Sequence, residues 1–218
     1  MNRLPLAALA AATLALTTAS AQIGIGIQGG FINSNVTFEQ IVNGSTEEFD
    51  TDAINAWTIG VPVEISLSKA FALQPEVNLL RRGYDFGEGN LAGGKVEYTV
   101  VSIPVLAKLG YVGSGFTAAA TFGPAFQYVA SGQTTLTLAG QETETKIDFD
   151  SPDADDFNRT SLYGILGAQA GFPLGFGKFV LDGRYRFQLN DEEGSDEVEV
   201  RGRGISATAG LIFTLGSY

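Results

Sequence analysis

The chain has 218 residues, with 24 acidic against 13 basic side chains and a formal net charge of −11 at pH 7. This acid excess argues against nucleic-acid binding, because phosphate contacts need clustered Lys and Arg. The chain contains no cysteine and no histidine, which excludes disulfides, a thiolate nucleophile and an imidazole base. We therefore expect a protein that is not an enzyme and that holds no cofactor.

Residues 1–21, MNRLPLAALAAATLALTTASA, are predicted to be a cleaved signal peptide. Arg3 precedes an apolar run that is shorter than the ~20 residues of a membrane-spanning helix. The small residues Ala19-Ser20-Ala21 then provide a cleavage site. Residues 22–218 are predicted to form one domain.

Eight stretches after residue 21 alternate apolar and polar residues with a period of two, which indicates β-strands. They are residues 22–32, 57–67, 71–82, 98–111, 116–130, 161–172, 178–190 and 204–215. The connections after the second, fourth and sixth strands are short, whereas 33–53 and 131–160 are long, polar and acidic. This alternation predicts an all-β fold, an eight-stranded antiparallel up-and-down transmembrane β-barrel.

One face of each predicted strand is apolar through its centre and carries aromatic residues near its ends, as membrane-interface girdles do. The predicted girdles are Phe71, Tyr111, Phe116, Phe172, Phe179 and Phe213 near the short turns, and Phe31, Trp57, Tyr128 and Phe187 toward the long loops. The other face is rich in Gly, Ser, Thr and Gln. We therefore expect the apolar face to contact lipid. The alternative is a soluble lipocalin-like ligand-binding barrel, with the apolar face inside.

Four prolines, Pro62, Pro75, Pro104 and Pro124, lie within the predicted strands. A closed barrel has no edge at which a missing hydrogen-bond donor is harmless. We therefore expect β-bulges or turn-proximal positions at these residues.

The polar face carries a few charges of both signs, most of them in the half of the barrel near the short turns. An eight-stranded barrel has an interior that side chains fill, and buried charge is tolerated when it is paired. We predict a structural ion-pair plug formed by Glu64, Glu76, Arg82, Lys108, Asp182, Arg184 and Arg186. The alternatives are a proton or ion path, or a catalytic dyad of Glu64 and Glu76.

An acidic run in the long segment 131–160 offers oxygen atoms suited to Ca²⁺. Its residues are Asp148, Asp150, Asp153, Asp155 and Asp156. The run lacks the glycine and the terminal glutamate of an EF-hand loop. A solvated acidic loop is the favoured interpretation, so no metal site is predicted.

Five stretches in chain order carry a resemblance to a known family: GIQGGFINSN, LSKAFALQPEVNLL, SIPVLAKLGY, FGPAFQY and DGRYRFQLND. Together they resemble the outer-membrane β-barrel domain family, the PorT-like proteins of Bacteroidota, across the mature chain. The resemblance implies an eight-stranded outer-membrane barrel, and only some members of that family act in protein secretion. Tyr218 resembles the terminal aromatic residue that the outer-membrane assembly machinery recognises.

These observations lead to one functional expectation with two alternatives. We expect a monomeric, non-enzymatic barrel in the outer membrane of a Gram-negative bacterium, with a side-chain-filled interior and acidic extracellular loops. Its partners would be membrane lipid, the assembly machinery, and an envelope, secretion or extracellular protein. The alternatives are a small channel or transporter barrel, and the soluble lipocalin-like barrel.

Overall fold

The computed structural model describes residues 22–42, 45–86, 92–112, 115–149, 158–190, 192–193 and 198–215. These ranges form eleven strands, and no helix within them has the length and apolar character to cross a membrane. The strands are β1 (Gln22–Val42), β2 (Ser45–Asp50), β3 (Asp52–Ser66), β4 (Phe71–Phe86), β5 (Ala92–Val112), β6 (Thr117–Leu138), β7 (Gln141–Lys146), β8 (Thr160–Leu174), β9 (Gly177–Gln188), β10 (Glu192–Glu193) and β11 (Val198–Leu215).

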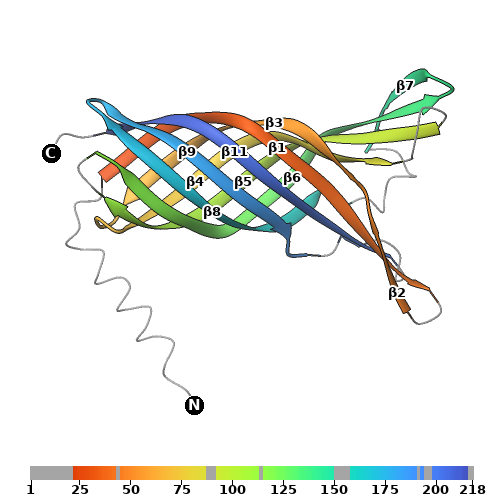
Figure 1. Cartoon of the computed structure of the whole chain (residues 1–218), viewed down its shortest axis with the longest axis horizontal. Helices are drawn as coiled ribbons and strands as arrows, with labels where there is room; N and C mark the ends of the chain where they lie inside the picture. The colour runs from red at the N-terminus through yellow and green to blue at the C-terminus, as the bar shows by residue number, and fades with distance from the viewer. Residues whose placement is uncertain are drawn as a thin grey trace, which may run out of the picture.

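Eight of these strands form a closed antiparallel barrel, because β11 pairs back onto β1 (Figure 1). The predicted fold class is therefore confirmed. One row of cross-strand partners circles the wall: Gln22, Ser66, Ala72, Lys108, Thr121, Gly167, Arg184, Ser206 and Ile32. The row returns to β1 ten residues beyond its start. Eight strands with a shear of ten give a tilt of about 40° and an interior that side chains fill.

The barrel has its apolar residues outside and its polar residues inside. On β9, Leu181 is 45% exposed whereas the adjacent Asp182 is 5% exposed. A water-soluble protein shows the reverse distribution. The large exposed side chains Ile25, Val61 and Leu166 lie on the outer wall in the same way. The apolar face points outward, as predicted.

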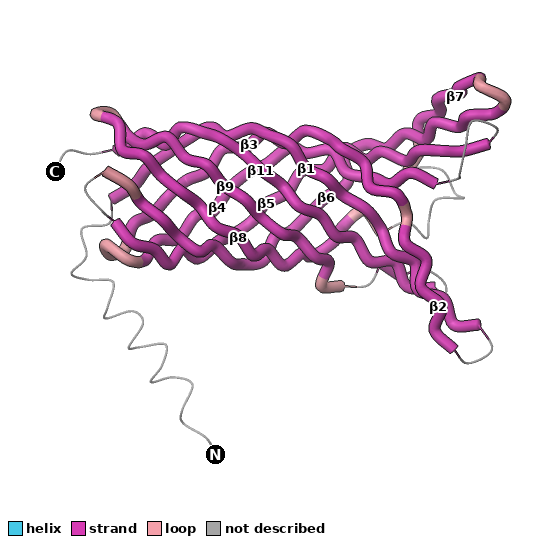
Figure 2. The backbone as a smooth tube through the Cα atoms, in the orientation of Figure 1, coloured by secondary structure: helices cyan, strands magenta, loops and turns pink. Residues whose placement is uncertain are grey.

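The two ends of the barrel differ. Residues 67–70 and 175–176 make short connections at one end. At the other end the hairpins β1–β2 and β6–β7 project well beyond the barrel wall (Figure 2). The β6–β7 turn consists of Ala139 (φ 51°) and Gly140 (φ 80°), the positive φ pair of a type I′ turn.

The prediction that 33–53 and 131–160 are loops is therefore wrong for much of both segments. Strands β1 and β6 continue past the apolar zone, and β2 and β7 pair with their extensions. Thr134, Thr135 and Thr137 supply strand propensity without the apolar alternation that a membrane-facing strand needs. The alternation stops where the lipid-facing surface ends, but the backbone ladder continues.

The prediction of β-bulges or turn-proximal positions at the strand prolines is also wrong: no register shift lies at these residues, and Pro104 and Pro124 lie well inside β5 and β6. Pairing skips the rungs beside Pro62 and Pro104 and resumes in the same register. For example, Ile25 pairs with Val63 and Gln28 with Gly60, with an unchanged offset. Each proline thus removes local hydrogen bonds without inserting a residue. The register shifts instead lie between Ala53 and Thr58 and between Thr99 and Val100, near the loop end.

Candidate functional site

The centre of the barrel interior is crossed by one ion pair. Glu76 on β4 and Arg184 on β9 stand on opposite walls, four strands apart in either direction around the barrel. Arg184 Nη1 donates to Glu76 Oε2 at 2.8 Å, and Nη2 donates to Oε1 at 2.7 Å. This bidentate geometry is the one in which a planar guanidinium binds a carboxylate most strongly. Both side chains are buried.

Amide side chains complete the hydrogen bonding of Glu76. Asn78 Nδ2 donates to Oε2 at 2.9 Å, Gln28 Nε2 donates to the same atom at 3.1 Å, and Gln74 Nε2 donates to Oε1. A carboxylate removed from water needs such donors, because an unsatisfied buried charge is costly. The glutamines and the asparagine of the polar face therefore have a specific role in holding the charge of Glu76.

Asp182 is the second carboxylate bound by Arg184. It accepts hydrogen bonds from Arg184 Nε and, at 3.1 Å, from Nη2. Gln169 Nε2 on β8 donates to Asp182 Oδ2 at 3.0 Å. Arg184 therefore binds one carboxylate on its own strand and one across the interior.

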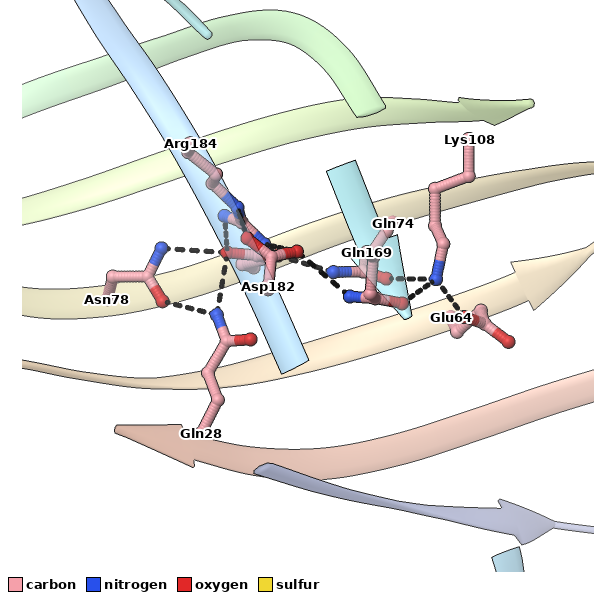
Figure 3. A network of polar contacts seen from close by, with 9 residues as sticks. Gln28, Glu64, Gln74, Asn78, Lys108, Gln169, Asp182 and Arg184 are labelled. Atoms are coloured by element: carbon pink, nitrogen blue, oxygen red, sulfur yellow. Dashed lines mark hydrogen bonds and ion pairs between the residues drawn. The ribbon is translucent and has the colours of Figure 1, made fainter. Parts of the chain in front are cut away.

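Glu64 forms a second centre nearer the short turns. Lys108 Nζ on β5 donates to Glu64 Oε2, and Lys178 Nζ on β9 donates to Oε1. Lys108 also donates to Gln74 Oε1 at 2.8 Å and to Gln169 Oε1. Because Gln74 and Gln169 contact Glu76 and Asp182 as well, the two centres form one network (Figure 3).

The charges of this network balance. Three carboxylates, Glu64, Glu76 and Asp182, face three cations, Lys108, Lys178 and Arg184. Lys178 was not among the predicted interior residues. It is the second residue of β9, two residues after the turn at 175–176. The period-two spacing that it shares with Asp182 and Arg184 was the signal that places it on the inward face.

Arg82 and Arg186 lie closer to the loop end than Glu76 and Arg184 do on the same two strands. Arg82 Nη1 donates to the hydroxyl of Tyr163, and the guanidinium carbon of Arg82 lies 5.3 Å from the centre of that ring. The Tyr163 hydroxyl in turn donates to Gln188 Oε1 at 3.1 Å. Arg186 is buried on β9, and its Nε and Nη1 have no hydrogen-bond partner among the described residues.

Apolar side chains fill the interior beyond the ion pairs. One cluster contains Ile32, Ala56, Leu80, Val100 and Val129, with Tyr98 and Phe149 packed against it. Another contains Leu106, Ala125, Tyr163 and Ile165. Sequence reasoning missed both clusters, although the position of Ile32, Leu80 and Val100 on the polar side of the alternation indicated that they face inward.

The predicted girdle residues lie on the outer wall in two groups. Near the short turns, the ring centres of Phe116 and Phe172 are 5.7 Å apart and those of Phe172 and Phe179 are 6.4 Å apart. Phe176, which was not predicted, stacks on Phe213 at 5.7 Å. Phe71 is partly exposed at the same end. Toward the loop end, Phe31, Trp57 and Tyr128 are exposed and Phe187 stacks with Tyr185. The side chain of Tyr111 lies outside the described residues.

The acidic run falls mostly outside the described residues. Asp148 is exposed, and Asp150, Asp153, Asp155 and Asp156 are not described. Within the described ranges, no group of three or more acidic residues is arranged to hold a metal ion. Residues 1–21 and Tyr218 are also not described, so the signal peptide and the terminal aromatic signal stay predictions.

Comparison with known families decides the membership of the chain. Residues 17–193 match the family described as the outer membrane protein beta-barrel domain. The chain belongs to this family. It is therefore an outer-membrane barrel of the Gram-negative envelope, with its apolar wall in lipid. The family resemblance found in the sequence is confirmed at this level, and the narrower likeness to PorT-like proteins stays a prediction. A search of curated proteins finds no match.

Solved structures of outer-membrane barrels are similar to this chain. Ail, the attachment invasion locus protein of Yersinia pestis, has 18% identity and a TM-score of 0.38, with 87% of this chain and 98% of Ail covered. OprG of Pseudomonas aeruginosa has 13% identity and a TM-score of 0.46, with 87% and 95% covered. OmpT, an outer membrane protease of Escherichia coli, has 10% identity and a TM-score of 0.48, with 92% and 100% covered. These likenesses concern the fold alone.

The presence of a protease among these structures corrects one prediction. The absence of His and Cys led us to expect that the chain is not an enzyme. That expectation was wrong. OmpT, which is among the similar barrels, is a protease. The fold is compatible with catalysis, and the prediction is withdrawn.

Proposed function

We propose that the protein is a closed outer-membrane barrel that acts through the hairpins at its loop end, as a structural and interaction protein of the envelope. In this proposal the barrel body anchors the hairpins in the membrane and does not conduct solutes. The partner is an envelope protein, a secretion component or an external surface.

The contact between Arg184 and Glu76 carries the first half of this proposal. A direct pair between opposite walls supports a closed interior at that level, because the two side chains meet inside the barrel. The Lys108–Glu64 pair nearer the short turns and the buried cluster around Leu80 and Val100 nearer the loops support the same conclusion. Polar and apolar side chains thus occupy successive levels of one narrow interior.

The projecting hairpin β6–β7 supports the second half. Every side chain of β7, QETETK, is exposed, and β7 pairs only with β6 among the described strands. Residues that need no partner for the stability of the barrel are available for recognition. Glu142 and Glu144 give this hairpin an acidic surface, which suits a partner with a basic surface.

Conductance in a planar lipid bilayer tests the closed interior. The purified mature protein is expected to insert without stable single-channel steps. The double variant Glu76→Ala, Arg184→Ala removes the side chains that meet across the interior and is expected to produce steps. Stable steps from the unmodified protein would support the channel alternative instead.

Site-specific photo-crosslinking in intact outer membranes tests the recognition surface. A photoreactive residue at Glu142 or Glu144 is expected to give a discrete protein adduct. The same residue at Leu181, on the lipid-facing wall, is the matched control and should give lipid adducts only. The interaction proposal fails if the two hairpin positions give no protein adduct, whatever the conductance result.

A further inference from the structure

Strand β7 has one free edge. It lies in the hairpin that projects beyond the barrel wall (Figure 1), and among the described strands it pairs only with β6. A tight two-residue turn joins the two strands. Every side chain of β7 is exposed. The other edge of this strand is therefore open to pairing with a further strand.

The backbone groups on the free edge follow from the pairing with β6. Ile147 N donates to Gly132 O at 2.9 Å, so Ile147 directs its backbone groups toward β6. In an antiparallel pair, successive residues direct their N–H and C=O groups alternately toward the partner strand and away from it. The residues of β7 whose N–H and C=O groups face the free edge are therefore Glu142, Glu144 and Lys146.

The two glutamates on this edge carry charge that the hairpin does not neutralise. Glu142 and Glu144 lie on the same face of β7, and their cross-strand partners on β6 are Thr137 and Thr135. Neither glutamate forms an ion pair with a described residue. Opposite charges on directly opposed residues of neighbouring strands attract, and like charges repel. A segment with Lys or Arg opposite each glutamate is therefore favoured over a second acidic strand.

The opposite face of the hairpin is partly apolar. Leu136 and Leu138 on β6 are 44% and 63% exposed, and Leu136 is the cross-strand partner of Thr143. In an added strand, a residue between two basic residues points to this face, because successive side chains alternate. A β-branched or apolar side chain at that position would extend the surface formed by Leu136 and Thr143.

We propose that β7 accepts an extended segment of its partner protein as an additional antiparallel strand, with Lys or Arg opposite Glu142 and Glu144 and a β-branched or apolar residue between them. Backbone hydrogen bonds along an edge strand give affinity, and the alternating side chains give selectivity. Antiparallel pairing is favoured because its ladder is slightly more stable than a parallel one. This inference rests on the proposed interaction function and specifies how the hairpin binds.

Hydrogen exchange measured by NMR, with the mature protein in phosphatidylcholine nanodiscs, tests strand addition directly. The probe is the capped peptide Glu-Thr-Lys-Val-Lys-Thr, which in antiparallel register places its first residue opposite Lys146 and its lysines opposite Glu144 and Glu142. The amides of Glu142 and Glu144 should exchange rapidly in the free protein and become protected at saturating peptide. A peptide that does not bind, or that binds and leaves both amides unprotected, would overturn the proposal. Protection of both amides before peptide is added, in a dimeric protein, would show that a second copy occupies the edge instead.

Lys146→Pro and Lys146→Gln separate strand addition from charge attraction alone. Both substitutions remove one positive charge, but only proline removes the open N–H, and an edge strand tolerates proline where its N–H faces outward. The peptide should bind Lys146→Pro about five-fold more weakly than Lys146→Gln, because one hydrogen bond to the added strand is lost. Equal affinities of the two variants would contradict strand addition.

The interaction function and strand addition fail in different ways. If photo-crosslinking at the hairpin gives a protein adduct but the peptide leaves the Glu142 and Glu144 amides unprotected, the interaction function stands and strand addition is wrong. If the peptide protects these amides but no protein adduct forms in the outer membrane, the edge accepts a strand and the proposed interaction function is wrong.

Discussion

Arg184 binds both oxygens of Glu76 across the full width of the barrel, at 2.7 and 2.8 Å. The two residues lie 108 positions apart in the chain and on opposite walls. Burial of Glu76 as a charge depends on Arg184, the cation that binds both of its oxygens, whereas Arg184 is also held by Asp182. This pair therefore links the closure of the barrel to its stability.

Arg184→Met is expected to destabilise the barrel by about 3–5 kcal/mol, because it leaves Glu76 and Asp182 buried without their cation. Arg184→Lys retains the charge but not the bidentate contact, so a loss of about 1–3 kcal/mol is expected. Urea unfolding of the protein in lipid vesicles measures both values. Equal stability of the lysine variant and the wild type would show that the two-point contact is unimportant.

Glu64→Gln is expected to destabilise the barrel because it leaves Lys108 and Lys178 close together without a carboxylate. The loss should be about 3–5 kcal/mol, reduced to the extent that Lys178 reaches water near the short turns. Adding Lys108→Met to Glu64→Gln should recover part of the loss. If the two substitutions are additive in urea unfolding, Glu64 and Lys108 are not coupled as the structure indicates.

Val61→Arg tests the lipid-facing wall. Val61 is exposed between the two aromatic groups, so an arginine there should cost about 2–4 kcal/mol in vesicles. Glu142→Arg on the projecting strand β7 is the matched control, and its effect should stay within about 0.5 kcal/mol. Similar small effects at both positions would argue against a membrane-facing surface at Val61.

Arg159 is expected to hold the segment after β7 against the barrel. Its guanidinium carbon lies 4.8 Å from the ring centres of both Tyr128 and Phe149. Two such contacts amount to about 1–2 kcal/mol, so Arg159→Ala should speed hydrogen exchange of the Ile147 amide about tenfold. That amide donates to Gly132 O at 2.9 Å. Exchange at Leu166, within the barrel wall, serves as the control and should not change.

Period-two alternation was sufficient to predict the eight barrel strands and which face of each strand points outward. Once the apolar face that includes Val63 and Ile65 is assigned to lipid, Glu64 between them must point into the barrel. The extensions of β1 and β6 could not be predicted in this way, because strands outside the membrane need no apolar face. The prolines misled us for a related reason: a missing donor removes a rung of the ladder, but it need not change the register.

The sequence predicted which residues point into the barrel, but it did not predict which of them contact each other. Whether Glu76 meets Arg184 or Lys108 depends on the shear of the closed barrel, which no single strand encodes. Lys178 was missed because it lies at the margin of a turn.

The fluorescence of Trp57 gives the most direct test of the inverted barrel. Trp57 is the single tryptophan of the chain and lies on the outer wall, paired with Phe31 near the loop end. In vesicles, lipids brominated near the headgroups should quench its emission strongly, and aqueous acrylamide should quench it weakly. Strong quenching by acrylamide with none by brominated lipid would contradict a barrel whose apolar wall faces the membrane.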